Sequence, residues 1–303
     1  MSKKLLIVIL GPTASGKSAL AEKLAAEFNG AIISADSRQI YRGMDIGTNK
    51  SKALLIDIVK PNQEFTVAQY KKIAIKAIKN IQKQGKVPFL VGGTGLYLTA
   101  IVDNLQIPKV KPNKILRCKL EKQTEKKLLA TLKKLDPQAA KVIDAKNKRR
   151  LVRALEVCLA GKKFSQKSQG KPLFDVLQIG LEISKEKLRQ NIEKRVNQML
   201  KKGLEKEVKD LVKKYGWTSV LKNTIGYSEW QNSLNLTKLS SELNLVKFRN
   251  KRKKELAALI SLHTTQLAKR QLAWFKKDKR IIWLKSPRQA ANLIKNFTGD
   301  VPP

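Results

Sequence analysis

The fold of this chain is decided by residues 5–18, which read Leu5-Leu6-Ile7-Val8-Ile9-Leu10-Gly11-Pro12-Thr13-Ala14-Ser15-Gly16-Lys17-Ser18. The apolar run predicts a buried strand, and the pattern from Ala19 to Phe28 predicts a helix. G-x-x-x-x-G-K-[ST] in this setting is the pattern of a phosphate-binding loop, because backbone N–H groups, the helix N-terminus and a lysine all face the phosphates. We therefore expect residues 11–18 to bind a diphosphate and the Ser18 hydroxyl to reach a metal ion. The loop does not say which molecule carries the phosphates.

The composition describes a strongly basic chain of ordinary hydrophobicity. The 303 residues are 42% hydrophobic, which is enough for one large domain with an addition, or for two domains. There are 63 Lys and Arg residues against 24 Asp and Glu, a net charge of +39. A polyanionic partner would relieve this self-repulsion, and nucleic acid is the leading candidate. The alternative is a surface that is rich in lysine without a specific partner.

The sequence also excludes several classes of protein. No apolar stretch reaches the roughly 20 residues of a membrane span, and the run at 5–10 is too short for a signal peptide. We therefore expect a cytoplasmic protein without a membrane partner. Cys118, Cys158 and His263 are its only cysteines and histidine, too few for a disulfide framework or a Cys/His zinc site. A metal here would be bound by oxygen, which indicates Mg²⁺.

Two further predicted strands end in polar or glycine-rich turns. Ala31–Ala35 leads to Asp36, and Val87–Val91 leads to the turn that contains Thr94. A helical pattern over 67–81 supplies the crossover that parallel strands require. Since ligands of open α/β sheets bind beyond the carboxyl ends of the strands, Asp36, Thr94 and the phosphate loop should share one crevice. Asp36 is then placed to accept a proton from an attacking hydroxyl or amine, or it simply caps the following turn.

The chain beyond residue 105 is helical and basic. A helix over 147–160 carries Arg149, Arg150 and Arg153, which form either a phosphate-binding patch or a solvated face. A long apolar stripe over 188–212 places Arg195 at its edge, where it either points into the crevice or lies along the surface.

The last segment of the chain repeats this basic, helical character. A helix over 246–277 contains Trp274 and Phe275, which either stack on bases or pack in the core, the core being expected for at least one. Residues 280–284 predict a closing strand that joins the sheet.

These elements predict an α/β fold with a phosphate-loop parallel sheet flanked by helices. We assign residues 1–109 to the first part of the catalytic core, 110–180 to an all-helical insertion, and 181–303 to the return to the core. This last part comprises a basic helical region and the closing strand.

The motifs together resemble the tRNA dimethylallyltransferase family, also called tRNA isopentenyltransferases. The resemblance runs over nearly the whole chain through GPTASGKS (11–18), SADSRQIYRGMDIGTNK (34–50), LIDIVKP (55–61), GGTGLYL (92–98), LDPQA (135–139), RLVRALEV (150–157), IGYSEW (225–230) and KRQLAWF (269–275). The block DSRQIYRGMDIGT is the most specific of these, because phosphate loops are common and this block is not.

The resemblance implies transfer of a dimethylallyl group from its diphosphate to the exocyclic N6 amine of the adenine immediately 3′ of the anticodon, in tRNAs that read U-initial codons. It implies Asp36 as general base, with Lys17, Thr13 and Arg195 acting on the diphosphate. The insertion then becomes a tRNA-binding domain, and the adenine is flipped into a channel. The tRNA anticodon stem-loop would contact Asp36, Ser37, Arg38, Gln39, Thr94, Arg117, Arg149, Arg150, Leu151, Val152, Arg153, Asn223, Gly226, Tyr227, Lys269, Arg270 and Gln271. We expect Mg²⁺ on Ser18, dimethylallyl diphosphate as donor, and a monomer.

Three features depart from the family pattern. The segment between Gly47 and Leu55 is shorter and lacks a His-containing stretch, Ala273 stands where relatives carry Thr, and the insertion has more lysine than arginine. These departures affect the expected tRNA-contacting rim more than the chemistry.

The residues leave other functions open. A small-molecule kinase would pair a phosphate loop with an aspartate on the second strand, and a related transferase would prenylate free AMP. A nucleotide-gated RNA-binding protein would have the basic surface without catalysis.

Overall fold

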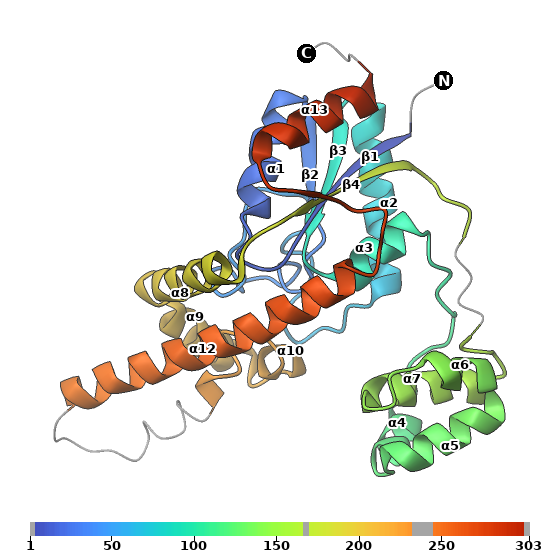
Figure 1. Cartoon of the computed structure of the whole chain (residues 1–303). Coiled ribbons are helices and arrows are strands. Elements are labelled where there is room, and N and C mark those ends of the chain that lie inside the picture. The colour runs from blue at the N-terminus through green and yellow to red at the C-terminus, as the bar shows by residue number, and fades with distance from the viewer. Residues whose placement is uncertain (1–3, 166–169, 232–244, 300–303) are drawn as a thin grey trace. The chain divides into compact units, whose positions relative to one another are not determined.

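The computed structural model describes residues 4–165, 170–231 and 245–299. These divide into two compact units: unit 1 comprises Met1–Val102 and Leu173–Pro303, and unit 2 comprises Asp103–Pro172 (Figure 1). The sequence-based limits of the helical insertion, 110–180, differ from unit 2 at both ends. The later limit is wrong because residues 175–181 form a strand of the sheet in unit 1.

Unit 1 contains a parallel sheet of order β2-β3-β1-β4-β5 among the described residues. The strands are β1 (Leu5–Leu10), β2 (Gly30–Ser34), β3 (Val87–Gly92), β4 (Asp175–Leu181) and β5 (Ile282–Leu284). The predictions of β1, β2, β3 and the closing strand β5 are confirmed, whereas β4 was not predicted. β1 is central and pairs with both β3 and β4, which explains why its sequence is an unbroken apolar run.

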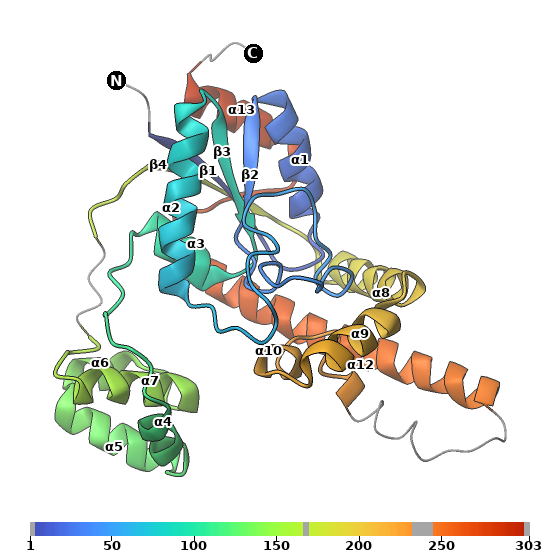
Figure 2. The same cartoon turned by 180° about the vertical axis from the view of Figure 1, so that it is seen from behind.

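Helices cover both faces of the sheet, as Figures 1 and 2 show. On one face α2 (Val67–Lys83) and α3 (Gly95–Val102) pack on Leu6, Val8 and Leu10. On the other, α1 (Lys17–Glu27) and α13 (Pro287–Thr298) pack on Ile7 and Ile9. Alternate residues of β1 therefore enter different cores, which fixes its register and places the phosphate loop at the carboxyl end of this central strand.

A third apolar core of unit 1 lies among helices beyond the carboxyl ends of the strands. These helices are α8 (Lys185–Lys201), α9 (Leu204–Tyr215), α10 (Ser219–Lys222) and α12 (Leu245–Phe275). The apolar stripe over 188–212 belongs to two helices, because the chain turns at Gly203, whose φ of 95° is a left-handed conformation that favours glycine. Met44 and Tyr41 of the loop after β2 pack into the same core.

Unit 2 is helical throughout its described secondary structure. Its helices are α4 (Lys114–Glu121), α5 (Glu125–Leu135), α6 (Pro137–Val142) and α7 (Lys148–Leu159). The helix predicted over 147–160 is confirmed as α7, and the Asn147 side chain caps it by accepting the N–H of Arg150. Leu128, Leu132, Leu151 and Leu155 form the centre of its core.

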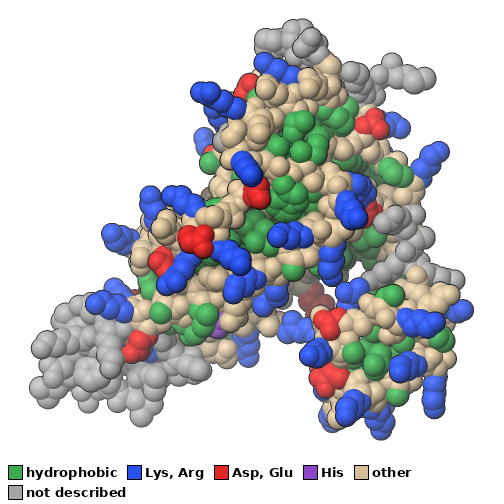
Figure 3. Space-filling view, viewed as in Figure 1, with side chains coloured by type: hydrophobic (Ala, Val, Ile, Leu, Met, Phe, Trp, Pro, Cys, Tyr) green, Lys and Arg blue, Asp and Glu red, His purple; other side chains and the backbone are tan. Residues whose placement is uncertain are grey.

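Basic side chains are spread over the visible face of each unit rather than gathered in one patch (Figure 3). In the part of the chain that the structure describes, no helix is long and apolar enough to cross a membrane.

Candidate active site

A cavity of about 460 Å³ in unit 1 opens beyond the carboxyl ends of β1, β2 and β3. It is lined by Thr13, Lys17, Asp36, Ser37, Arg38, Gly47, Thr48, Gly93, Thr94, Gly95, Leu96, Arg195, Val196, Met199, Asn223, Thr224, Ile225, Ile260, Thr264, Leu267, Arg270, Gln271 and Trp274. The predicted convergence of the phosphate loop, Asp36 and Thr94 is therefore confirmed. The helices α8 and α12, which come later in the chain, supply another wall of the cavity, and much of that wall is apolar.

Lys17 supplies the cationic side chain of the phosphate loop. It is the first residue of α1, and its Nζ donates a hydrogen bond to the carbonyl oxygen of Pro12 at 3.1 Å. Burial lowers the pKa of Lys17 to about 8, although the neighbouring Asp36 raises it and Arg195 lowers it further. A half-buried cation at a helix N-terminus attracts an anionic ligand, because that ligand restores the interactions lost from water.

Arg195 reaches the same loop from α8. Its Nη1 donates to Thr13 Oγ1 at 3.0 Å, so it points into the cavity and does not lie along the surface. Burial lowers the pKa of Arg195 from its ordinary value, while Asp36 raises it. Lys17 and Arg195 thus place two positive charges beside Asp36, from elements almost 180 residues apart.

Asp36 lies on the cavity wall directly after β2. Its Oδ1 accepts the N–H of Arg38 at 2.8 Å, so the capping role is present. The adjacent Ser37 N–H donates to Thr94 Oγ1 at 3.0 Å, which joins the turn after β2 to the turn after β3. Capping orients the carboxylate and does not exclude chemistry, because a carboxylate has further lone pairs.

Gln271 connects two turns instead of presenting a free amide to RNA. Its Oε1 accepts the N–H of Thr13 at 2.8 Å, and its Nε2 donates to the carbonyl of Gly93 at 2.9 Å. Gln39, also predicted to bind nucleotide, is buried, and its amide donates to the carbonyls of Thr48 and Asn49. Both amides thus form hydrogen bonds within the fold, and their contact with tRNA stays a prediction.

The predicted tRNA contacts at 223–227 divide in the same way. Asn223 lines the cavity, whereas Tyr227 is buried with its hydroxyl bonded to Glu207, and the N–H of Gly226 donates to Glu229. A buried tyrosine whose hydroxyl already has an acceptor does not contact RNA, so that prediction is wrong for Tyr227. Tyr227 lies in a motif shared with the family, and nothing in that motif distinguishes a residue that packs in the core from one that binds RNA.

On α12, Lys269 and Arg270 are exposed, and Arg270 lies at the cavity. Trp274 also lines the cavity and is 44% exposed, whereas Phe275 is 3% exposed and packs in the core. The expectation that at least one of the two aromatic residues is in the core is confirmed.

The predicted RNA-binding residues of unit 2 have different surroundings. Leu151 and Val152 are buried in its core, so their side chains do not reach a ligand and their prediction is wrong. Arg117 and Arg153 both pair with the buried carboxylate of Glu156, which also accepts the N–H of Asn113. Arg149 and Arg150 are exposed at the start of α7. The arginine patch is therefore partly structural and partly solvent-facing.

A metal site at the phosphate loop would depend on Ser18 and the ligand, and Ser18 itself is not among the residues that line the cavity. No group of three or more His, Cys, Asp or Glu side chains suited to a metal occurs among the described residues. Mg²⁺ fits this donor set, because it retains several waters and commonly takes its remaining ligands from substrate phosphates. Within the described chain, Ser15 Oγ of the same loop is buried without a hydrogen-bond partner, although Ser15 is not among the residues that line the cavity.

Several cavity residues were not predicted from the sequence. Val196, Met199, Ile260 and Leu267 give the cavity an apolar wall, and they come from the stripes of α8 and α12. Stripes of this kind also occur wherever a helix packs on a core, so the pattern alone does not distinguish a ligand wall from packing.

The fold and the site define a phosphate-loop α/β enzyme whose anion site adjoins a carboxylate and an apolar wall. The family model described as IPP transferase matches residues 39–278. The chain is 42% identical to the tRNA dimethylallyltransferase of Microcystis aeruginosa, with 99% of this chain and 93% of the relative covered.

Solved structures give the same result. The chain resembles a tRNA isopentenylpyrophosphate transferase from Bacillus halodurans with a TM-score of 0.68 and 32% identity, over 98% and 96% of the two chains. It resembles a eukaryotic dimethylallyltransferase acting on tRNA with a TM-score of 0.79 and 26% identity, over 99% of this chain and 81% of the other. The chain belongs to the IPP transferase family.

Proposed function

We propose that this protein transfers a dimethylallyl group from dimethylallyl diphosphate to N6 of the adenine immediately 3′ of the anticodon, in tRNAs that read U-initial codons. One observation carries the proposal: a single cavity combines the phosphate loop, Asp36 and an apolar wall. A diphosphate ester with a short hydrocarbon chain requires the phosphate loop and the apolar wall. An amine acceptor requires a base such as Asp36.

The reaction forms a bond between N6 and C1 of the allyl group, and the bond between C1 and the diphosphate oxygen breaks. Asp36 accepts the proton that N6 loses. Lys17 and Arg195 stabilise the negative charge that develops on the leaving diphosphate, and Thr13 is oriented by Arg195 for the same purpose. Val196, Met199 and the other apolar residues of α8 and α12 exclude water from the allyl carbon, which would otherwise be hydrolysed.

The phosphate loop is proposed to hold Mg²⁺ through the Ser18 hydroxyl together with the diphosphate. Bound Mg²⁺ supplies neutralisation of the diphosphate charge. The backbone of residues 11–18 and the Ser15 hydroxyl contribute uncharged donors to the same anion.

The partner is proposed to be the anticodon stem-loop of tRNA, bound by a monomer. Arg149, Arg150, Lys269 and Arg270 are exposed and suited to phosphate contacts. Trp274, exposed at the cavity, offers a ring on which a base that leaves its stack can lie.

The test is incubation of the protein with unmodified tRNA, dimethylallyl diphosphate and Mg²⁺, followed by mass spectrometry of the nucleosides. We expect N6-dimethylallyladenosine at the position 3′ of the anticodon and release of one diphosphate for each modified base. Phosphoryl transfer from ATP to a small acceptor without tRNA would support the kinase instead. Prenylation of free AMP at a comparable rate would support the AMP transferase.

A further inference from the structure

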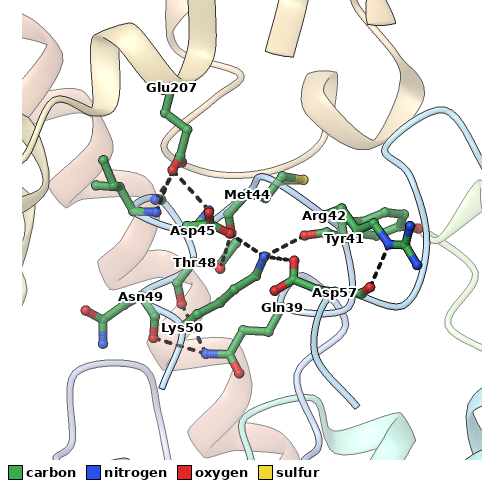
Figure 4. Close-up of polar contacts among 12 residues, drawn as sticks. Gln39, Tyr41, Arg42, Met44, Asp45, Thr48, Asn49, Lys50, Asp57 and Glu207 are labelled. Carbon is green, nitrogen blue, oxygen red and sulfur yellow. Dashed lines mark hydrogen bonds and ion pairs between the residues drawn. The ribbon is translucent and has the colours of Figure 1, made fainter. Parts of the chain in front are cut away.

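Glu207 of α9 holds the backbone of the loop after β2 from outside the cavity. Its Oε2 accepts the N–H groups of Asp45 at 3.0 Å and Ile46 at 2.7 Å, and its Oε1 accepts the N–H of Gly47 at 3.1 Å (Figure 4). The hydroxyl of Tyr227 donates to the same Oε1 at 2.6 Å. One half-buried carboxylate therefore accepts four hydrogen bonds, three of them from consecutive backbone amides.

The segment that Glu207 holds forms part of the cavity wall. Gly47 and Thr48 line the cavity, and the ring of Tyr227 lies against Gly47 so closely that a Cβ there would be 2.4 Å from it. Tyr227 follows Thr224 and Ile225, which line the cavity from the turn after α10. Glu207 thus connects two walls, although it is not itself among the lining residues.

A second anchor holds the same segment from within its own loop. Lys50 Nζ donates to the carbonyl of Tyr41 at 2.8 Å and pairs with Asp45 and Asp57, each at 2.5 Å (Figure 4). Asp45 is bound by both anchors, through its backbone by Glu207 and through its side chain by Lys50. Because Lys50 secures the fold of the loop locally, Glu207 has the separate effect of setting its place against α9.

Charge accounts for the strength of this contact. Hydrogen bonds from neutral donors to an ionised carboxylate are stronger than those between neutral groups. Burial raises the pKa of the Tyr227 hydroxyl, and the adjacent Glu207 raises it further, so the tyrosine remains a donor. The preceding helix α8 carries Arg195 and is joined to α9 at Gly203. The contact of Glu207 therefore also fixes the position of Arg195 relative to the loop after β2.

We propose that Glu207 is a positioning residue of the transferase, which sets the geometry of the cavity through the backbone of residues 45–47. It does not touch the substrates. This inference rests on the proposed function, because the geometry in question is that of prenyl transfer. Loss of its charge leaves both substrates bound and moves the reacting groups out of alignment, and displacements on the order of 1 Å lower rates about a hundredfold.

The experiment uses the full chain with Glu207→Gln, which keeps the shape of the side chain but replaces one acceptor oxygen with an amide NH2 that cannot accept hydrogen bonds from backbone N–H groups. Single-turnover prenylation is measured at saturating tRNA and dimethylallyl diphosphate. We expect the rate constant to fall by about tenfold to a hundredfold, with reaction amplitude unchanged and the Kd for tRNA within about threefold. Glu193→Gln on α8, which breaks an exposed ion pair with Arg189, is the matched control and should change the rate less than twofold.

Tyr227→Phe provides a second variant that keeps the ring over Gly47 and removes one of the four bonds. We expect about a threefold lower rate constant, and no further loss when it is combined with Glu207→Gln, because both act through one contact. Hydrogen exchange of a peptide covering residues 41–50 should be faster in Glu207→Gln, a result that is independent of activity.

Three outcomes would overturn the inference. A wild-type rate constant for Glu207→Gln would do so, as would a reduced amplitude with an unchanged rate constant, which indicates only a smaller folded fraction. If Glu207→Gln does not fold, an unchanged rate for Tyr227→Phe would do so as well. Absence of prenylation by the wild-type protein would instead contradict the proposed function, and the exchange measurement would still report on the contact.

Discussion

In the proposed mechanism, Asp36 combines a structural and a chemical task in one side chain. Its Oδ1 caps the turn by accepting the N–H of Arg38, and it lines the same cavity as the phosphate loop and the turn at Thr94. A cap of this kind restrains the carboxylate, and restraint is what a general base requires. The two interpretations of Asp36 are therefore compatible.

Replacement of the carboxylate tests the chemical task. For Asp36→Asn we expect kcat to fall by about a hundredfold to ten-thousandfold, because the amide cannot accept the N6 proton. The amide oxygen still caps Arg38, so tRNA affinity should change little. Asp210→Asn on the exposed side of α9 is the control for loss of one charge. Wild-type turnover by Asp36→Asn, measured by release of diphosphate, would exclude this residue as the base.

In the proposed function, Lys17 binds the diphosphate and does not contact the RNA. For Lys17→Ala we expect kcat/KM for dimethylallyl diphosphate to fall by at least about a hundredfold, a loss typical of removing one preorganised donor. The Kd for tRNA, measured by filter binding, should stay within about twofold. A parallel loss of tRNA affinity would show that the two binding functions are not separate.

At the scale of elements, unit 2 owes part of its stability to one buried carboxylate. Burial alone would raise the pKa of Glu156, which is 2% exposed. Hydrogen bonds from Arg117, the Asn113 N–H and Arg153, together with the Arg117 charge, lower its pKa to about 2. These partners join α7 to α4 and the segment before it.

Because the pKa of Glu156 is lower in the folded state than its ordinary value near 4.5, its stabilising effect is complete above pH 4.5. It is lost as the pH falls from 4.5 toward 2. For Glu156→Gln at pH 7 we expect a loss of about 3 kcal/mol in the stability of unit 2, since two arginines lose their counter-charge. Hydrogen exchange of α7 amides at pH 7 and pH 3 checks this. The difference between variant and wild type should shrink at the lower pH, and a constant difference would contradict the assignment.

The elements were predictable where the local pattern agreed with the packing. β1, β2, β3, α2 and α7 follow from apolar periodicity and caps. β4 was missed because Gln178 and Gly180 interrupt its apolar pattern, and Gln178 is satisfied by Asp278, a hundred residues away. The break between α8 and α9 depends on the left-handed conformation of Gly203, which a continuous apolar stripe hides.

At the scale of the whole molecule, the charge of +39 supplies general attraction for a polyanion. Figure 3 shows basic side chains distributed over both units, as a lysine-rich surface would have them. Specific attachment must then come from a few directional contacts. The exposed Arg150 is a better candidate for such a contact than Arg153, which already holds Glu156.

The salt dependence of tRNA binding distinguishes these contributions. For Arg150→Gln we expect weaker binding and a log Kd versus log salt slope that is smaller by about 1, the change for one lost phosphate contact. Lys79→Gln on α2 removes the same charge from an exposed site on unit 1 and should leave the slope nearly unchanged. Equal effects of the two variants, measured by filter binding between 50 and 200 mM salt as typical conditions, would favour general attraction over a specific contact.

The sequence by itself determined the phosphate loop, the sheet strands with apolar runs, the position of Asp36 and the family. These depend on residues that are adjacent in the chain, where spacing reports directly on local structure. Only the tertiary structure decided which residues of the shared motifs face the cavity. Gln271 bonds to Gly93 and Arg195 to Thr13, 178 and 182 positions away, whereas Gln39 bonds within its own loop and Tyr227 bonds to Glu207. A polar side chain has the same chemistry in either role, so its function depends on partners that only folding brings within reach.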